Sequence, residues 1–544
     1  MSTSKVLKGT ALLSGATIIS RILGFIYFFP FQALVGSDGV ALYSYAYSWY
    51  GILLSFSTAG IPIAVSKFVA KYNALGDYGT SKRLYNSSLK VMMFMGFLGF
   101  LILFFGAPYV SELIVRSKTP DPGFVADVTL TMRALSFALI IVPAMSVTRG
   151  YFQGFQHMKP SAVSQVVEQI ARVIFILVGS FIVSKILGGS VASSVAVATF
   201  GAVIGAIASV SMLVMYWKKY NGLRPPEGER KVRSSSVPLT KMYMELLRYA
   251  IPIVFVGIAI PLYTLVDQYT VADALQAVGT PLDKANAVFA YITNYAQKLI
   301  MIPASLATGF SLTIIPAITQ SFTGGKLDQL QNQIEKIFTI LLFFTIPASF
   351  GLASIAYDAF RMVYFDHNTA LEGSQYLISF APSAVMSAIF TVSAAILQGI
   401  DYQRKTMIAF TAGIIIKVLV NTPLLYALGG HGAVLGTILG YLVSDVIMLY
   451  CIVKYTKFNI AKTGKTVLLI TIYSAAMSAV VIGAKTLLKW LIPGQTYMES
   501  LLIVVVCGAL GALVYFAFVF TSGLASDILG DRINRLPLLK KLKR

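Results

Sequence analysis

The chain has 544 residues, of which 57% are hydrophobic and only 12% are charged. A soluble globular protein carries about twice that charged fraction, so the composition excludes an ordinary soluble domain. A net charge of +21 would indicate nucleic-acid binding in a soluble protein, but membrane proteins concentrate Lys and Arg in their cytoplasmic loops. Because backbone groups in lipid must be hydrogen-bonded internally, we predict an all-α integral membrane protein.

The apolar runs, at about 20 residues per crossing, predict about 14 transmembrane helices. In chain order they cover residues 9–35, 43–70, 88–115, 125–151, 160–184, 191–217, 242–270, 285–320, 331–357, 375–400, 405–428, 432–454, 466–489 and 499–522. The run at 285–320 is long enough to hold two segments.

Positive charges gather in alternate connections between these helices. If the N-terminus is cytoplasmic, most of the 43 Lys and Arg residues fall on the cytoplasmic side, including those in 218–248 and 532–544. This is the bias that the positive-inside rule describes. We therefore expect a multi-pass protein of the cytoplasmic (inner) cell membrane with both termini in the cytoplasm.

The longest polar stretch follows the sixth predicted helix and is rich in Pro, Gly, Ser and charge, which is typical of a flexible linker. Because six is even, the seventh helix starts on the same side of the membrane as the first, which allows the two halves to be parallel repeats. We expect two six-helix lobes related by a pseudo-twofold axis along the membrane normal. The predicted parts are an N-terminal six-helix lobe (1–220), a basic cytoplasmic linker (221–240), a C-terminal six-helix lobe (241–456), a helix pair (457–522) and a basic cytoplasmic tail (523–544).

Five cations interrupt the predicted spans: Arg21, Arg133, Arg172, Lys298 and Lys417. A charge at the bilayer centre costs about 2.5–3.5 kcal/mol on insertion scales, so such side chains should face a cavity or a partner. Arg133 is close to its helix end and can snorkel. We predict that the other four bind substrate. A cavity with this excess of cations favours an anionic substrate such as a phosphate or diphosphate.

The acidic residues within the spans are fewer: Glu168, Asp267 and Asp445. Glu168 and Asp267 are candidate ion-coupling residues. Glu168 also precedes Arg172 by four residues, a spacing that equally fits a structural ion pair, and this alternative stays open. An exporter of cationic compounds should show more carboxylates than cations in its spans, which is the opposite of the observed balance.

Motifs for catalysis or metal binding are not found. The three histidines, His157, His367 and His431, lie far apart in predicted loops, and no metal-ligand spacing, nucleotide-binding loop or nucleophile elbow occurs. We expect no enzymatic step, no catalytic residues, no metal and no cofactor.

Three segments carry a family resemblance: SRILGF at 20–25, AGIPIAVSKFVAKY at 59–72 and RGYFQGFQHMKPSAVSQVVEQIARV at 149–173. Over essentially its whole length the chain resembles the MOP exporter superfamily, and within it the stage V sporulation protein B and YtgP group. This resemblance implies a flippase for lipid II or a related undecaprenyl-diphosphate sugar in peptidoglycan biosynthesis. It also implies alternating access through a cationic cavity between the lobes, with the last two helices forming a groove for the lipid tail.

The resemblance extends to particular residues. Arg21 matches the first essential arginine of helix one, and Lys298 matches an arginine of helix eight. Tyr27 and Leu54 stand where the family has further arginines, so the cavity charge would be redistributed to Arg172 and Lys417.

The partners implied are the lipid-linked sugar, membrane lipids and cell-wall synthesis proteins, with no nucleic acid. Two other functions stay open. One is a multidrug or cation antiporter of the same superfamily, which would need a functional carboxylate. The other is a non-transporting scaffold in cell-wall or sporulation assembly.

Overall fold

The computed structural model describes residues 3–58, 60–115, 122–220, 238–364, 367–491 and 496–529. Within these ranges the chain is helical and contains no strand, which confirms the predicted all-α class. Most of the predicted linker (221–237) and the basic tail from residue 530 onward lie outside the described residues.

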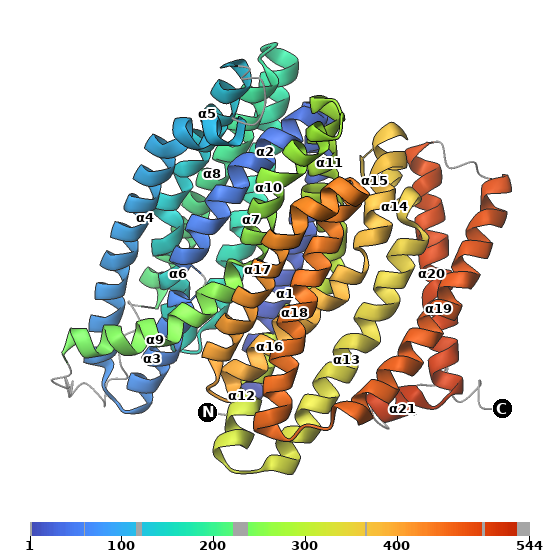
Figure 1. The fold of residues 1–544 in the computed structure, drawn as a ribbon. Coiled ribbons are helices and arrows are strands. Elements are labelled where there is room, and N and C mark those ends of the chain that lie inside the picture. The colour runs from blue at the N-terminus through green and yellow to red at the C-terminus, as the bar shows by residue number, and fades with distance from the viewer. Residues whose placement is uncertain are drawn as a thin grey trace. The chain divides into compact units, whose positions relative to one another are not determined.

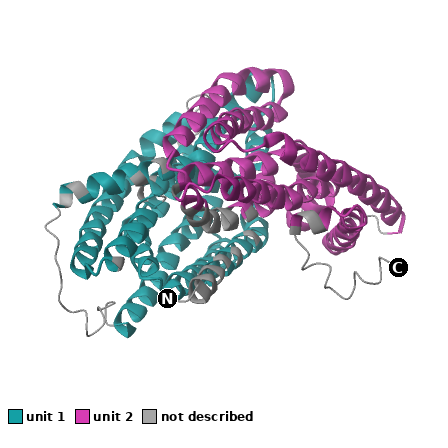
Figure 2. Ribbon diagram, turned by 90° about the horizontal axis from the view of Figure 1, so that it is seen from below, with its two compact units in different colours: residues 1–290 teal, residues 291–544 magenta. Residues whose placement is uncertain are grey.

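The chain divides into two compact units, residues 1–290 and 291–544 (Figure 2). The division falls within the eighth predicted span, where an α-helix gives way to a π-helical turn, Tyr291–Ala296. The first unit thus contains the six helices of the predicted N-terminal lobe and also the helices of 239–290.

The helices of the first unit follow one another along the chain from blue to green in Figure 1. Ser190 begins α8 by accepting a hydrogen bond from the Ser193 backbone N–H, as helix-capping serines do. The helices are α1 Thr3–Ile26, α2 Phe28–Thr58, α3 Ile61–Ala74, α4 Tyr78–Val115, α5 Pro122–Ser136, α6 Ala138–Gly154, α7 Met158–Phe181, α8 Val191–Lys219, α9 Leu239–Gly257, α10 Ala259–Ala277 and α11 Leu282–Ala290.

The second unit begins with the π-helical turn. Thr496 and Glu499 form a capping box at the start of α20. The helices are α12 Gln297–Thr323, α13 Leu327–Ser354, α14 Ala356–Tyr364, α15 His367–Phe380, α16 Pro382–Gly399, α17 Gln403–Leu428, α18 Gly430–Thr456, α19 Ile460–Leu491, α20 Tyr497–Thr521 and α21 Leu524–Leu529.

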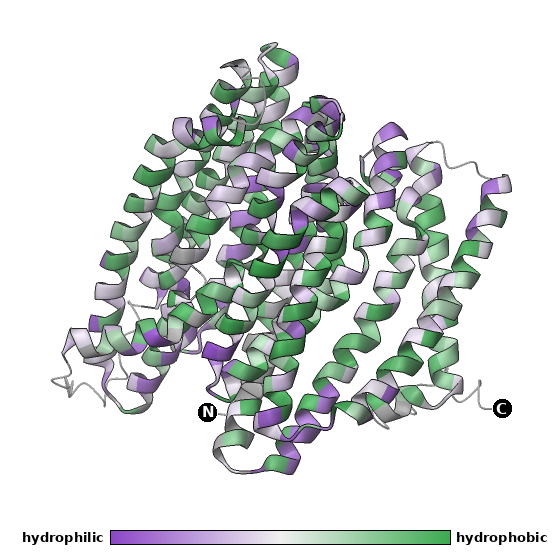
Figure 3. Ribbon diagram, viewed as in Figure 1, coloured by the Kyte–Doolittle hydropathy of each residue, from purple (hydrophilic) through white to green (hydrophobic). Residues whose placement is uncertain are grey.

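Eleven helical segments of the described chain are long and apolar enough to cross a membrane, and α9 with α10, bent by 45°, makes a twelfth. Hydrophobic residues predominate along such helices as α4 and α20 in Figure 3. The two remaining predicted spans, 43–70 and 285–320, coincide with α2–α3 and with α11, the π-helical turn and α12. The prediction of about 14 spans is therefore confirmed.

Glycines allow close packing among helices of the first unit. A Cβ atom on Gly150 of α6 would lie 2.4 Å from the Pro62 carbonyl oxygen of α3, and one on Gly205 of α8 would lie 2.8 Å from the Glu168 carbonyl oxygen of α7. Small residues at helix interfaces are typical of membrane proteins, because they let backbones approach. This packing brings the ends of α6, α7 and α8 together around a charged cluster.

Candidate functional site

Two arginines share one glutamate between α6 and α7. Arg149 Nη2 lies 2.8 Å from Glu168 Oε2, and Arg172 Nη2 lies 2.5 Å from Glu168 Oε1. The three side chains are only 12–22% exposed. The ion pair that the four-residue spacing of Glu168 and Arg172 predicted is thus present, and the cluster carries a net positive charge.

Arg149 ties this cluster to its surroundings. Its Nε donates to Ser164 Oγ over 2.9 Å, and its Nη2 donates to Ser209 Oγ of α8 over 2.7 Å. Its own carbonyl oxygen accepts a hydrogen bond from Ser161 Oγ. Arg149 falls at the end of the predicted span 125–151, and the sequence did not single it out for this role. The sequence feature that could have indicated this role is Glu168, because a carboxylate within a span needs a cationic partner and the spans contain more cations than carboxylates.

Arg172 lies beside a group of tyrosines on α2. Tyr43, Tyr47 and Tyr50 lie near its guanidinium group, and the rings of Tyr43 and Tyr47 stack with centroids 4.2 Å apart. Arg172 Nε has no hydrogen-bond partner among the described residues. The Nε–H of Arg172 therefore has no acceptor within the described chain, while Nη2 donates to Glu168.

Tyr27, at a position where the resemblance expects an arginine, is buried between α1 and α2. Its hydroxyl lies 3.0 Å from the hydroxyl of Tyr43. Tyr27 thus joins the same aromatic group, replacing a charge with a neutral hydrogen bond.

Arg21 is exposed on α1. The residues one position before and three positions after it, Ser20 and Gly24, face α7: Ser20 Oγ lies 3.5 Å from the Gln165 carbonyl oxygen, and a Cβ on Gly24 would meet Gln169 Nε2 at 3.2 Å. Arg21 follows Ser20 directly and precedes Gly24 by three residues, so it lies at the edge of the face of α1 that packs on α7.

Asp267 is buried in α10, with 4% of its surface exposed. It belongs to the first unit, as do Arg21, Glu168 and Arg172. The helix that carries it packs against α2 and α11.

The two predicted lysines belong to the second unit. Lys417 of α17 has no exposed surface, and its Nζ donates to Thr437 Oγ1 of α18 over 2.5 Å. Lys298 is partly buried directly after the π-helical turn, and such turns occur frequently at functional sites.

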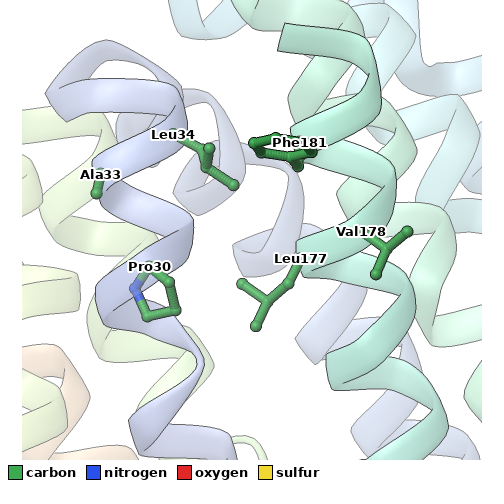
Figure 4. Close-up of a pocket in the computed structure, with 6 residues that line it drawn as sticks. All are labelled: Pro30, Ala33, Leu34, Leu177, Val178 and Phe181. Carbon is green, nitrogen blue, oxygen red and sulfur yellow. The ribbon is translucent and has the colours of Figure 1, made fainter. Parts of the chain in front are cut away.

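An apolar groove of about 480 Å³ separates α2 from α7 in the first unit (Figure 4). It is lined by Pro30, Ala33 and Leu34 on α2 and by Leu177, Val178 and Phe181 on α7. This lining offers no polar side chain to a headgroup and suits a hydrocarbon chain.

Comparisons with known proteins agree with this fold. Residues 6–322 match the polysaccharide biosynthesis protein family. The chain is 38% identical over 536 residues to the lipid II flippase MurJ of Bacillus subtilis (strain 168), covering 97% of this chain and 98% of that protein. It is 25% identical over 449 residues to stage V sporulation protein B of the same organism, covering 81% and 82%. A solved structure of lipid II flippase MurJ in an inward closed conformation has a TM-score of 0.61 at 16% identity, covering 95% of this chain and 99% of that one.

Proposed function

Because this chain belongs to the polysaccharide biosynthesis protein family, we propose that it moves a lipid-linked cell-wall precursor across the cytoplasmic membrane. The substrate is lipid II or a related undecaprenyl-diphosphate sugar. One observation carries this proposal: 38% identity to the B. subtilis lipid II flippase MurJ extends over nearly the whole length of both chains.

The physical difficulty of this reaction is the diphosphate. An ionised group transferred into hydrocarbon without partners costs far more than a protein can offset, whereas guanidinium and ammonium groups bind phosphate oxygens through charge-assisted hydrogen bonds. We assign this role to Arg21, Arg172, Lys298 and Lys417. Alternating access would present the bound headgroup first to the cytoplasm and then to the outside, and no covalent step is involved.

Arg172 is suited to a binding role because of its geometry. Its Nη2 is held by Glu168 while its Nε, among the tyrosines of α2, has no partner within the described chain. This N–H could donate a hydrogen bond to a phosphate oxygen without releasing the glutamate. Glu168, held between two guanidinium groups, is better suited to orienting Arg172 than to exchanging a coupling ion.

The lipid tail would remain outside the cavity. Helices α19 and α20 pack on α13 through a buried cluster that includes Ile470, Met477, Cys507 and Tyr515, and the Tyr515 hydroxyl donates to the Phe343 carbonyl oxygen. Their other faces expose such large apolar residues as Leu468, Ile472 and Leu513. We propose that the prenyl chain lies along this face, and that cell-wall synthesis proteins receive the headgroup outside.

Complementation tests the proposal directly. A bacterium depleted of its own lipid II flippase would express the parent protein, Arg21→Ala or Lys298→Ala at matched membrane levels. Lys284→Ala is the matched control, because Lys284 is exposed on α11. We expect growth with the parent and the control, and at least a tenfold loss of viable counts with the two test variants.

Each other outcome removes a specific part of the proposal. No growth with a well-inserted parent would exclude lipid II and leave a different lipid-linked glycan. Normal growth with Arg21→Ala would take Arg21 out of the binding site.

A further inference from the structure

A buried carboxylate in the second unit lacks partners. Asp445 of α18 has 3% of its surface exposed, and neither of its carboxylate oxygens has a hydrogen-bond partner among the residues that the structure describes. It also forms no ion pair within that part of the chain. This contrasts with Glu168, which holds two arginines.

The neighbours of Asp445 can be identified from a layer of aromatic rings that lies one helical turn away from it, between α16, α17 and α18. The Phe390 ring of α16 lies 5.7 Å from the Tyr441 ring of α18 and 6.3 Å from the Phe410 ring of α17, centroid to centroid. Short connections join the three helices (Figure 1), so α16 and α18 run parallel and α17 runs opposite to them.

One helical turn from this layer, each helix carries a polar residue. Ser393 follows Phe390 by three residues, Asp445 follows Tyr441 by four, and Thr406 precedes Phe410 by four. Because residues three or four apart share a helix face, and because α17 is antiparallel, all three are displaced toward the same end of the bundle. The Ser444 hydroxyl, which donates to the Ala409 carbonyl oxygen over 3.1 Å, fixes the same register between α17 and α18.

The two hydroxyl groups of this layer are also unsatisfied. Ser393 and Thr406 are buried, and neither hydroxyl has a hydrogen-bond partner within the described residues. An ionised carboxylate would draw these donors to itself, since charge-assisted hydrogen bonds are the strong ones. The layer instead has the character of a neutral, weakly polar cluster.

The charged groups on the surrounding helices do not neutralise Asp445. Helix α16 has no titratable residue. On α17, Lys417 is bonded to Thr437, eight residues before Asp445 and thus about 12 Å away along the helix, and partly buried Lys405 forms no ion pair with Asp445. Helix α15 meets α18 near His431, through Ser379 and Tyr376, about 20 Å from Asp445 along the axis.

The remaining groups are those of α13, of α18 itself and of the exposed helix ends. Glu335 of α13 is paired with Lys462 of α19, and Lys336 is exposed. On α18, Tyr441 is a phenol one turn away from Asp445, and Lys454 is exposed nine residues further along the helix. Arg404 and Glu372 are also exposed. Burying an isolated carboxylate is so costly that the group neutralises instead.

We propose that Asp445 is a proton-binding site, a carboxylic acid that is neutral while α16, α17 and α18 are packed as here and that releases its proton when water reaches this layer. The ligand is the proton itself. On the basis of the proposed transport function, this site would couple proton release to opening of the second unit.

Infrared difference spectroscopy of the full chain in lipid nanodiscs measures the proton directly. At neutral pH we expect a carbonyl stretching band of a neutral carboxylic acid that is lost in Asp445→Asn and kept in Asp401→Asn. Asp401 is exposed and has φ 65°, a conformation that asparagine also adopts, so it controls for the substitution itself. If Asp445→Asn does not accumulate, Ser393→Ala should shift the frequency of the same band.

Two results would overturn the assignment. One is the absence of an acid band that depends on Asp445. The other is thermal stabilisation by sodium that Asp445→Asn abolishes, because that would make the ligand a metal cation.

Translocation of lipid II in proteoliposomes, measured under opposite pH gradients, then tests the coupling. We expect the wild-type rate to change with the gradient and the Asp445→Asn rate not to change. A wild-type protein that shows the acid band but moves no lipid II would refute the transport function and leave the proton site standing. A wild-type rate that is independent of the gradient would refute the coupling.

Discussion

At the scale of single residues, the shared carboxylate of Glu168 decides how the first unit holds its charges. One glutamate neutralises part of the combined charge of two arginines that lie 23 residues apart in the sequence. The pairing with Arg172 was predictable, because both residues are on one helix face. The pairing with Arg149 was not, because it depends on how closely α6 packs on α7 and α8.

Removing the negative charge should be costly. Glu168→Gln would leave two largely buried guanidinium groups without a counter-ion, and breaking such a pair costs about 3–5 kcal/mol. We expect the melting temperature in detergent to fall by several degrees, as measured with a fluorescent reporter dye that does not react with cysteine thiols. Glu372→Gln on the exposed face of α15 is the matched control. Equal melting temperatures for the two variants would show that the cluster contributes little to stability.

The buried ammonium of Lys417 allows stability and function to be separated. Lys417→Met keeps the chain length and removes a charge that has no exposed surface. Replacing a buried charge by an apolar side chain of similar volume is often neutral or stabilising. We therefore expect an unchanged or higher melting temperature together with weaker complementation. Full complementation would instead take Lys417 out of the proposed binding site, and a lower melting temperature would indicate a structural role.

At the scale of helices, the positions of the spans were predictable and their interruptions were not. Hydropathy located each span, because the bilayer sets a length that the sequence must meet. The break between α1 and α2 at Tyr27 and the π-helical turn before Lys298 have no comparable signal. Nor does Asp358, which falls between the predicted spans 331–357 and 375–400 but is fully buried on α14, 3.5 Å from Lys489 of α19. That contact joins residues more than a hundred positions apart, which no local pattern reports.

Helix packing in the first unit depends on particular glycines. Gly150→Ala would place a methyl group 2.4 Å from the Pro62 carbonyl oxygen, so α3 and α6 must separate, at a cost of about 1–3 kcal/mol. Gly106→Ala on α4, where nothing lies within 4 Å of the new atom, should be neutral or slightly stabilising. Thermal unfolding of both variants in the same detergent checks this. A Gly150→Ala protein as stable as the Gly106→Ala protein would contradict the close approach.

At the scale of the whole molecule, the distribution of Lys and Arg predicts which side of the membrane each connection faces. Cys451 and Cys507 are buried, so the native protein should react little with a membrane-impermeant maleimide. We expect Lys284→Cys, between the seventh and eighth predicted spans, to be labelled in intact cells. Lys326→Cys, in the connection between α12 and α13, should be labelled only after lysis. The reverse labelling pattern would show that the protein has the opposite orientation in the membrane.

The bridge at Glu168 also constrains how this protein can change by mutation. A substitution of Glu168 alone leaves two arginines without their counter-ion, and a substitution of either arginine alone changes the net charge of the same cluster. Single substitutions in this cluster are therefore expected to give impaired proteins, whereas a suitable double substitution can avoid the impairment because neighbouring residues are energetically coupled. A genetic selection for suppressors of Glu168→Gln should recover second-site changes at Arg149 more often than elsewhere, because losing that cation restores the cluster's original net charge while Arg172 stays available to the substrate.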